Sequence, residues 1–230
     1  MRGAMALWFV AALSACAPAG DPAGIRRSTA RIDPGDVIVG SREAEDARPV
    51  RAAAPGPFRI GVAEVTVDAY ARYLTDRRAP ASSHPQTVYR NGRFAPRPAS
   101  AGRPVAFVSF DDAAAYCAWA SRTPGRRVRL PTEEEWEAAA RGGIRGAPYP
   151  WGWDPPDRRV PYRLDGPVPA RSGPANPYGL FGMAGNLYEW CLPGDDAPPG
   201  RAPVRGGSWA ETVDGALHVA RRVFLPKDYR

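Results

Sequence analysis

The sequence is poor in three residue types that carry much of protein chemistry: lysine, histidine and cysteine. Its 230 residues contain one lysine, two histidines and three cysteines. The histidines, His84 and His218, are too few and too far apart along the chain to predict a three-ligand zinc or iron site. No serine lies in the strand-turn-helix context of a nucleophile elbow, so the sequence does not predict a hydrolase of that kind.

Because Lys227 is the only lysine, the basic side of the charge balance is almost entirely arginine. The formal net charge is +7, from 31 basic and 24 acidic residues. The arginines are scattered as single residues and isolated pairs, without the long basic runs that grip phosphates. We therefore predict a weakly basic surface and no nucleic-acid partner.

A hydrophobic run long enough to span a bilayer is also missing. The apolar stretch over residues 4–13 is far shorter than the ~20 residues that a spanning helix needs, and it is typical of a signal peptide. It ends in Leu13-Ser14-Ala15-Cys16, which resembles a bacterial lipobox. We predict a lipoprotein signal peptide over residues 1–16, lipidation at Cys16 and a flexible tether over residues 17–32. The alternative is an ordinary signal peptide that happens to contain a cysteine.

This prediction places the protein in the bacterial cell envelope, held to the membrane by its N-terminal lipid on the periplasmic face. Ala17 after the cysteine favours the outer membrane over the inner one. In such an oxidising compartment Cys117 and Cys191 have three options: they pair in a disulfide, stay free, or are buried as small apolar residues. The sequence does not choose between them.

The body of the chain has the composition of a globular domain, rich in glycine and proline, which predicts many turns and ordered loops. We expect extended segments over residues 33–40, 58–65, 104–110 and 128–130. Residues 42–57 and 78–104 are expected to be loops or irregular.

Three helices are predicted from their capping residues. Thr66 caps one that runs to about Asp76, Ser109 with Asp112 opens one that runs to Ala120, and Thr132 with Glu135 opens one that Gly142 ends. The acidic run over residues 133–135 suits the positive end of the last helix, and we assign it no chemistry. No helix is expected after Gly143.

Several motifs follow one another along the body of the chain. They are GVAEVTVDAYARYL (61–74), PVAFVSFDDAAAYCAWA (104–120), RLPTEEEWEAAARGG (129–143), YPWG (149–152), NPYGLFGMAGNLYEW (176–190) and VRGGSW (204–209). In this order they resemble the formylglycine-generating enzyme family, also called the sulfatase-modifying factor family, and RLPTEEEWE and GNLYEW are the most specific of them. The resemblance covers residues 33–230. It implies an irregular α+β fold related to C-type lectins, with few short helices and strands and long ordered loops.

The resemblance also implies where the chemistry would lie. The family's aerobic oxidases hold Cu(I) with two cysteines that follow the GGS[WF] motif, and Glu211 and Ala216 stand at those two positions here. A soft, low-coordinate Cu(I) ion selects thiolates, which neither residue can replace. We therefore expect copper to be absent from this protein.

A family calcium site is a further expectation. Its ligands would be the backbones of Gly185 and Leu187 and the carboxylate of Glu189, although Gly182 stands where an acidic or amide side chain is usual. Equally well, Glu189 is a buried acceptor that binds backbone amides of its loop. The tryptophans of the motifs are expected in the core.

Three functions follow. The first is a cell-envelope lipoprotein whose domain binds or assists an envelope protein or peptide without copper chemistry. The second is an oxidoreductase of the formylglycine-generating type that acts on a protein or peptide. The third is a carbohydrate-binding module like a C-type lectin.

Overall fold

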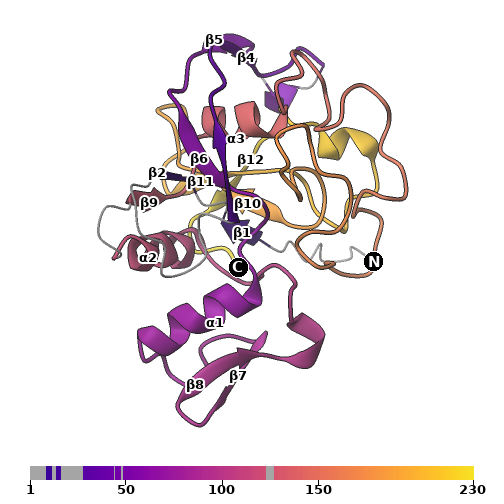
Figure 1. Ribbon diagram of the computed structural model, residues 1–230. Helices are drawn as coiled ribbons and strands as arrows, with labels where there is room; N and C mark the ends of the chain where they lie inside the picture. The colour runs from indigo at the N-terminus through magenta and orange to yellow at the C-terminus, as the bar shows by residue number, and fades with distance from the viewer. Residues whose placement is uncertain (1–8, 12–13, 17–27, 44, 48, 123–126) are drawn as a thin grey trace.

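The computed structural model describes residues 9–11, 14–16, 28–43, 45–47, 49–122 and 127–230. The chain folds into short helices and strands joined by long loops, an α+β architecture (Figure 1). Its α-helices are α1 (Val67–Asp76), α2 (Phe110–Ala120) and α3 (Glu133–Ala140), and its 3-10 turns are η2 (Glu45–Ala47), η3 (Pro98–Ser100) and η4 (Asp214–Leu217).

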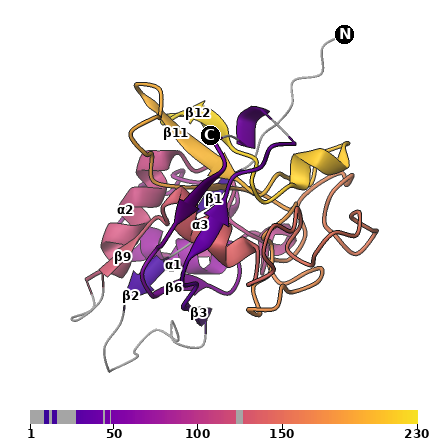
Figure 2. The same cartoon turned by 90° about the horizontal axis from the view of Figure 1, so that it is seen from above.

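The strands form two four-stranded sheets and two hairpins. They are β1 (Phe9–Ala11), β2 (Ser14–Cys16), β3 (Thr29–Ile32), β4 (Val37–Val39), β5 (Arg51–Ala53), β6 (Phe58–Gly61), β7 (Thr87–Arg90), β8 (Arg93–Pro96), β9 (Arg127–Arg129), β10 (Tyr188–Trp190), β11 (Arg201–Arg205) and β12 (Val223–Pro226). One sheet has the order β1-β10-β11-β12 and the other β3-β6-β2-β9, while β4 pairs with β5 and β7 with β8. In Figures 1 and 2, α2 and the loops that follow α3 lie on opposite sides of these sheets.

The three predicted helix starts are confirmed, because each predicted cap is formed. The Thr66 side chain accepts a hydrogen bond from the Ala69 amide at the start of α1. Full capping boxes open α2, at Ser109, and α3, at Thr132. Such caps satisfy backbone N–H groups that have no partner inside the helix. After Gly143 the chain forms no α-helix, as predicted, and its only helical element there is the short 3-10 turn η4.

Other sequence predictions were wrong. Residues 104–110 form no strand, because Phe107 has a left-handed backbone with φ of 59°, which interrupts an extended run. Residues 78–104, expected to be irregular, contain the β7–β8 hairpin.

The N-terminal boundaries also need correction. Residues 42–57 include strand β5, which pairs with β4. Strand β3, at the end of the predicted tether, pairs with β6 and fully buries Ile32, so the ordered domain begins at or before Thr29. Residues 17–27 lie outside the described part of the chain.

Strands β1 and β2 fall in the segment predicted to be a signal peptide. β1 pairs with β10, and β2 pairs with β6 and β9. These pairings belong to the unprocessed chain, and cleavage with lipidation at Cys16 stays a prediction. Among the described residues, no helix combines the length and apolar character required to cross a bilayer.

Aromatic side chains from the motifs fill the core. Trp136 of α3 and Trp190 of β10 are both fully buried, and Trp190 donates its indole N–H to the Val108 carbonyl at 3.1 Å. The other motif tryptophans, Trp119, Trp151 and Trp209, are only partly buried. The predicted core placement is therefore confirmed for Trp136 and Trp190. Both donate their indole N–H groups to acceptors, as a buried indole requires.

Candidate functional site

A cavity of about 680 Å³ opens beside η4, next to one of the two positions where the copper cysteines would stand. Two chain segments far apart in sequence form its walls, the region around η2 and the region around η4. The lining residues are Glu43, Asp46, Val213, Gly215, Ala216, His218 and Arg221. Ala216 is buried at its edge, and Val213 is 59% exposed.

The charged groups of this cavity are held in place from both walls. Arg221 donates from Nε to Oδ2 of Asp46 at 2.6 Å, which joins the η2 region to the C-terminal segment. The other oxygen of Asp46, Oδ1, is buried and has no hydrogen-bond partner among the described residues. Because two carboxylates face one arginine, the cavity carries one negative charge in excess.

His218 completes the cavity with a neutral ring. Its Nε2 lies 3.2 Å from the Tyr149 hydroxyl, and its Nδ1 lies 3.9 Å from Oε2 of Glu43. Burial lowers the pKa of His218 below its usual 6.5, the largest of the effects on it, and nearby Glu43 opposes this. The imidazole is therefore mainly uncharged at neutral pH.

Glu211, at the other copper-cysteine position, is engaged by a hydrogen bond from a neighbouring motif. The Tyr188 hydroxyl donates to Oε1 of Glu211 at 2.7 Å. Burial, and secondarily the Glu211 charge, raise the pKa of Tyr188 above 10, so that it stays a donor. The Glu211 carbonyl also accepts the Arg163 amide at 3.1 Å, which fixes the backbone of this loop.

The two described cysteines lie elsewhere and do not pair. Cys117 packs in the core cluster around Trp190, whereas Cys191 packs in the cluster around Trp136, and both are free and buried. Burial raises the pKa of Cys117 to about 12 and that of Cys191 above 9. The disulfide left open by the sequence is therefore not formed, and the option of buried apolar cysteines is the one observed.

These residues do not fit copper. A glutamate and an alanine occupy the positions that the family resemblance assigns to the thiolates, and Cys117 and Cys191 lie in separate core clusters with raised pKa values. Among the described residues there is also no group of three or more His, Cys, Asp or Glu side chains arranged to hold a metal ion.

A second carboxylate, that of Glu64, lies against the predicted calcium loop and was not foreseen from the sequence. Oε2 of Glu189 accepts the Trp136 indole N–H at 3.1 Å, and Oε2 of Glu64 accepts the Asn186 amide at 3.1 Å. A Cβ at Gly182 would lie only 2.8 Å from the Glu64 carboxylate, so Glu64 fills the space that a side chain at position 182 would take.

Both carboxylates of this loop are almost inaccessible to solvent, with exposures of 3% for Glu64 and 2% for Glu189. Burial raises the pKa of Glu189 to about 8, and burial together with the Glu189 charge raises that of Glu64 well above 4.5. Oε1 of Glu64 has no hydrogen-bond partner among the described residues. The Leu187 backbone amide lies against Glu64, and carboxylate oxygens are the ligand type that calcium takes.

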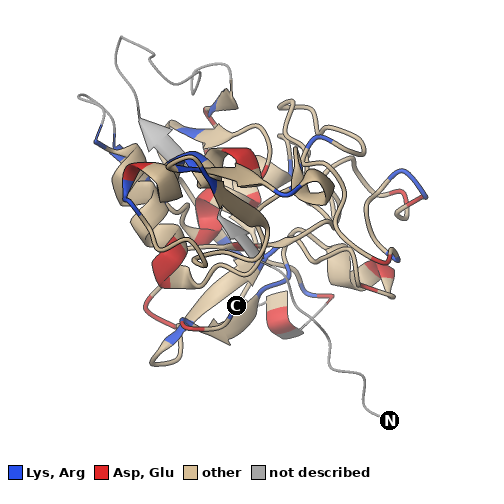
Figure 3. Ribbon diagram, turned by 90° about the horizontal axis from the view of Figure 1, so that it is seen from below, with Lys and Arg blue, Asp and Glu red and all other residues tan. Residues whose placement is uncertain are grey.

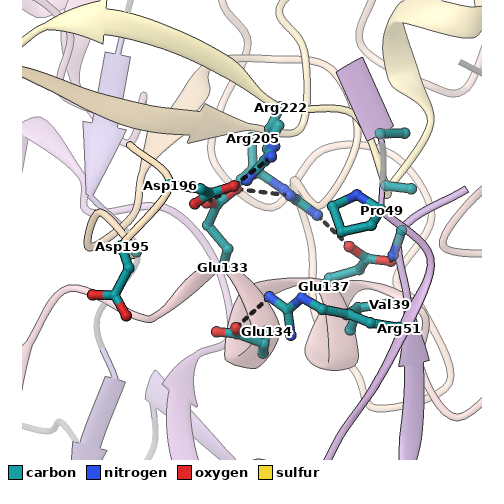
Figure 4. Close-up of a pocket in the computed structure, with 14 residues that line it drawn as sticks. Val39, Pro49, Arg51, Glu133, Glu134, Glu137, Asp195, Asp196, Arg205 and Arg222 are labelled. Carbon is teal, nitrogen blue, oxygen red and sulfur yellow. Dashed lines mark hydrogen bonds and ion pairs between the residues drawn. The ribbon is translucent and has the colours of Figure 1, made fainter. Parts of the chain in front are cut away.

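A second cavity, of about 490 Å³, lies over the start of α3 and is lined by an ion-pair network (Figure 4). Arg205, only 3% exposed, donates to Glu133 at 3.1 Å and to Glu137 at 2.6 Å. Arg222 joins Glu133 to Asp196, which lies at the rim. The network connects α3 to β11 and to the residue before β12. The acidic run at the start of α3 therefore has a structural role. That role includes these ion pairs, which the helix-capping pattern did not predict.

Sequence reasoning found some of these residues and missed others. The motifs gave Glu189, Glu211 and Ala216. Glu43 and Asp46 were missed because they lie in a segment expected to be a plain loop and reach the cavity only through the fold. Glu64 was part of a quoted motif, and its distance of more than a hundred residues from Glu189 hid the pairing.

Comparison with known proteins gives a family match over most of the chain. Residues 17–228 match the family model "Sulfatase-modifying factor enzyme 1-like domain". An inactive C-alpha-formylglycine-generating enzyme 2 from Bos taurus is 41% identical over 135 residues, which is 52% of this chain and 43% of that protein. The formylglycine-generating enzyme of Mycobacterium tuberculosis is 43% identical over 109 residues, 39% of this chain and 33% of that protein.

Two further proteins are similar over most of this chain. The serine/threonine-protein kinase pkn1 of Chlamydia caviae is 31% identical over 210 residues, 80% of this chain and 33% of the kinase. The structure of PvdO from Pseudomonas aeruginosa superposes with a TM-score of 0.68 at 22% identity, covering 88% of this chain and 89% of that one. The chain thus spans less than half the length of these curated relatives, and the solved structure shows a shared fold.

Proposed function

The chain belongs to the family of sulfatase-modifying factor enzyme 1-like domains, and we propose that it is a binding module of that family without copper chemistry. In this proposal the domain holds a segment of an envelope protein or peptide at the cavity beside Ala216. The observation that carries it is the pair of residues at the copper-cysteine positions, since Glu211 is committed to Tyr188 and Ala216 has no ligand atom.

Relatives support the loss of oxidase chemistry. The mammalian proteins at about two-fifths identity carry the name inactive C-alpha-formylglycine-generating enzyme 2. Function depends on the residues of the site more than on the fold. A domain can therefore lose its reacting groups while its scaffold still forms a ligand cavity. The kinase pkn1 relatives carry a similar domain in about a third of their length, as a module beside other parts.

The lining of the cavity suggests the kind of segment it takes. The excess negative charge of Glu43 and Asp46 over Arg221 favours a basic side chain, and the exposed carboxylate of Glu43 would accept its N–H groups. Exposed Val213 adds an apolar contact at the rim. A peptide with one lysine or arginine next to an apolar residue satisfies both.

Attachment to the envelope would come from the lipid at Cys16, which we retain as part of the proposal. Mass spectrometry of the protein from a bacterial membrane fraction tests it directly. A mature N-terminus at Cys16 that carries a lipid supports the assignment, whereas an N-terminus elsewhere contradicts it.

Calcium would be held by the loop around Glu189, with Glu64 as the additional carboxylate. Terbium reports on such a site, because it replaces calcium and its luminescence is excited through a nearby tryptophan, here Trp136. Glu64→Gln should weaken terbium binding, and Asp165→Asn, an exposed carboxylate elsewhere, should leave it unchanged. Equal binding by both variants would remove Glu64 from the site.

Two experiments test the binding function itself. The full chain is first reconstituted with Cu(I) and offered a cysteine-containing peptide; stoichiometric copper with oxidation of that cysteine would contradict the proposal in favour of the oxidoreductase. Capture from an envelope extract then compares Glu43→Arg with the exposed control Asp165→Arg. The proposal requires a protein or peptide that the control retains and Glu43→Arg loses.

Carbohydrate binding has one observation in its favour, the 64% exposed side chain of Trp153. If the protein binds glycans and Trp153→Ala abolishes that binding while Glu43→Arg does not, the lectin-like function replaces the proposal.

A further inference from the structure

The positive charge of the chain is concentrated in one lobe, residues 67–103, which contains α1, β7, β8 and η3. This lobe projects from the body at the bottom of Figure 1. It contains seven arginines and two aspartates, a net charge of +5 out of +7 for the whole chain. The most basic segment of the sequence is therefore the part of the fold that projects from the body.

Six of these arginines are exposed to solvent: Arg72, Arg77, Arg78, Arg90, Arg93 and Arg97. In the described chain none of the six forms an ion pair with a carboxylate, although ten other arginines do. The two aspartates of the lobe are occupied by other donors, since Asp68 accepts the Gly102 amide and Asp76 accepts the Trp119 indole N–H. The positive charge of the lobe is thus not neutralised within the molecule.

Four of the arginines belong to two segments that lie side by side in the lobe, the tip of the β7–β8 hairpin and the end of α1. The β7–β8 hairpin turns at Asn91 and Gly92, both with positive φ, so Arg90 and Arg93 face each other across its tip. The Phe94 amide donates to Oγ1 of Thr75 at 2.8 Å, which fixes this tip beside the last turn of α1.

That last turn of α1 leads directly into Arg77 and Arg78. We call Arg77, Arg78, Arg90 and Arg93 the arginine tip. Figure 3 views the molecule from below, the side on which the lobe projects, with every described Lys and Arg in blue.

An aromatic side chain lies next to the arginine tip. Tyr89 is 45% exposed and packs against Phe94 at a ring-centroid distance of 4.9 Å. Tyrosine favours the boundary between water and lipid, where its apolar ring and polar hydroxyl both find partners. Guanidinium groups bind phosphate oxygens through paired N–H donors.

We propose that the arginine tip and Tyr89 bind an anionic lipid surface through its phosphate headgroups. The tip is a projecting hairpin and helix end rather than a groove, so it suits a flat surface better than an enclosed strand of nucleic acid. This surface is separate from the cavity beside Ala216, so the inference does not depend on the binding function proposed above.

The test is binding to vesicles by the full chain, carrying Cys16→Ser in every sample so that no lipid is attached. Vesicles of phosphatidylcholine with and without phosphatidylglycerol are compared by co-sedimentation. Arg90→Gln with Arg93→Gln is the test variant. Arg145→Gln with Arg158→Gln removes the same charge from exposed positions in the loops after α3 and is the matched control.

We expect binding that requires phosphatidylglycerol and that the test variant weakens by about tenfold, while the control changes it less than about twofold. The melting temperatures of both variants should equal that of the parent chain, which excludes unfolding as the cause. Equal losses in the two variants would overturn the inference, because binding would then follow net charge alone. Binding of a DNA duplex that depends on the tip, without binding to the anionic vesicles, would overturn it in favour of nucleic acid.

Discussion

The Tyr188 hydroxyl donates a 2.7 Å hydrogen bond to the carboxylate of Glu211, joining the GNLYEW motif to the loop after β11. Tyr188 is 7% exposed, whereas Glu211 is half-buried. By the family resemblance Glu211 stands at one of the two copper-cysteine positions. In this structure its carboxylate accepts a hydrogen bond that links two segments of the fold.

Tyr188→Phe should lower the free energy of unfolding by about 1–2 kcal/mol, because it removes a donor to a carboxylate. Glu211→Gln should cost less, since it keeps an acceptor oxygen. Denaturant unfolding of both single variants and the double variant gives the coupling between them, which we expect to be about 1 kcal/mol. Additive effects would show that the bond contributes nothing to stability.

Arg205→Met should be among the most destabilising single substitutions in the chain. It leaves Glu133 and Glu137 buried without their shared partner, and breaking a buried pair in this way costs about 3–5 kcal/mol. The matched control is Arg51→Met, whose pair with Glu134 is largely exposed and contributes less than about 1 kcal/mol. Thermal unfolding of the two variants side by side would contradict the assignment if their losses were similar.

Gly185→Ala should destabilise the protein more than Gly146→Ala does. Both glycines have φ near +80°, so both substitutions carry the same backbone penalty of about 1–2 kcal/mol. At Gly185 a Cβ would also lie 2.5 Å from the Pro161 carbonyl oxygen, whereas at Gly146 it would meet nothing within 4 Å. Overpacking of this kind adds about 1–3 kcal/mol. Equal melting temperatures for the two variants would show that the loop yields at Gly185.

Buried His84 should make the stability of the protein depend on pH. Its Nε2 lies 2.8 Å from the Ala106 carbonyl, and burial lowers its pKa below the usual 6.5. Between the folded pKa and 6.5 the unfolded chain binds more protons than the folded one, so folding is favoured less as the pH falls through this range. The contribution of the neutral histidine is fully present above pH 6.5.

The measurement is the free energy of unfolding of the parent chain and of His84→Gln between pH 7.5 and about pH 5. The parent should lose more stability than the variant over this range, although the variant is less stable at pH 7.5. Parallel curves would show that His84 does not take up its proton on unfolding.

The helix starts could be predicted because an N-cap depends only on residues that are adjacent in the sequence. Thr66, Ser109 and Thr132 each formed the predicted cap. The extended segment at residues 104–110 failed where Phe107 adopts a left-handed backbone, which tertiary contacts impose and side-chain pattern does not reveal.

The sites divide in the same way. Glu211 and Ala216 were found because they lie at a fixed spacing after the GGSW motif. Their inability to act as thiolates follows from residue type alone. Asp46 and Glu64 were not found, because each meets its partners across more than a hundred residues of chain. The arginine tip was missed for a related reason, since the hairpin tip comes to lie beside the end of α1 only through the contact of Phe94 with Thr75.

The position of Arg205 at the last residue of β11 has a consequence for how such domains diverge. The buried ion pairs end there, and the following eleven residues, up to Ala216, contain only turns and the start of η4. Residues 209–215 of that stretch are half-buried or exposed, so selection can exchange residues there at little cost to the α3 anchor while the framework is inherited intact. A lineage can in this way abandon one chemistry and acquire a new ligand without passing through an unfolded ancestor.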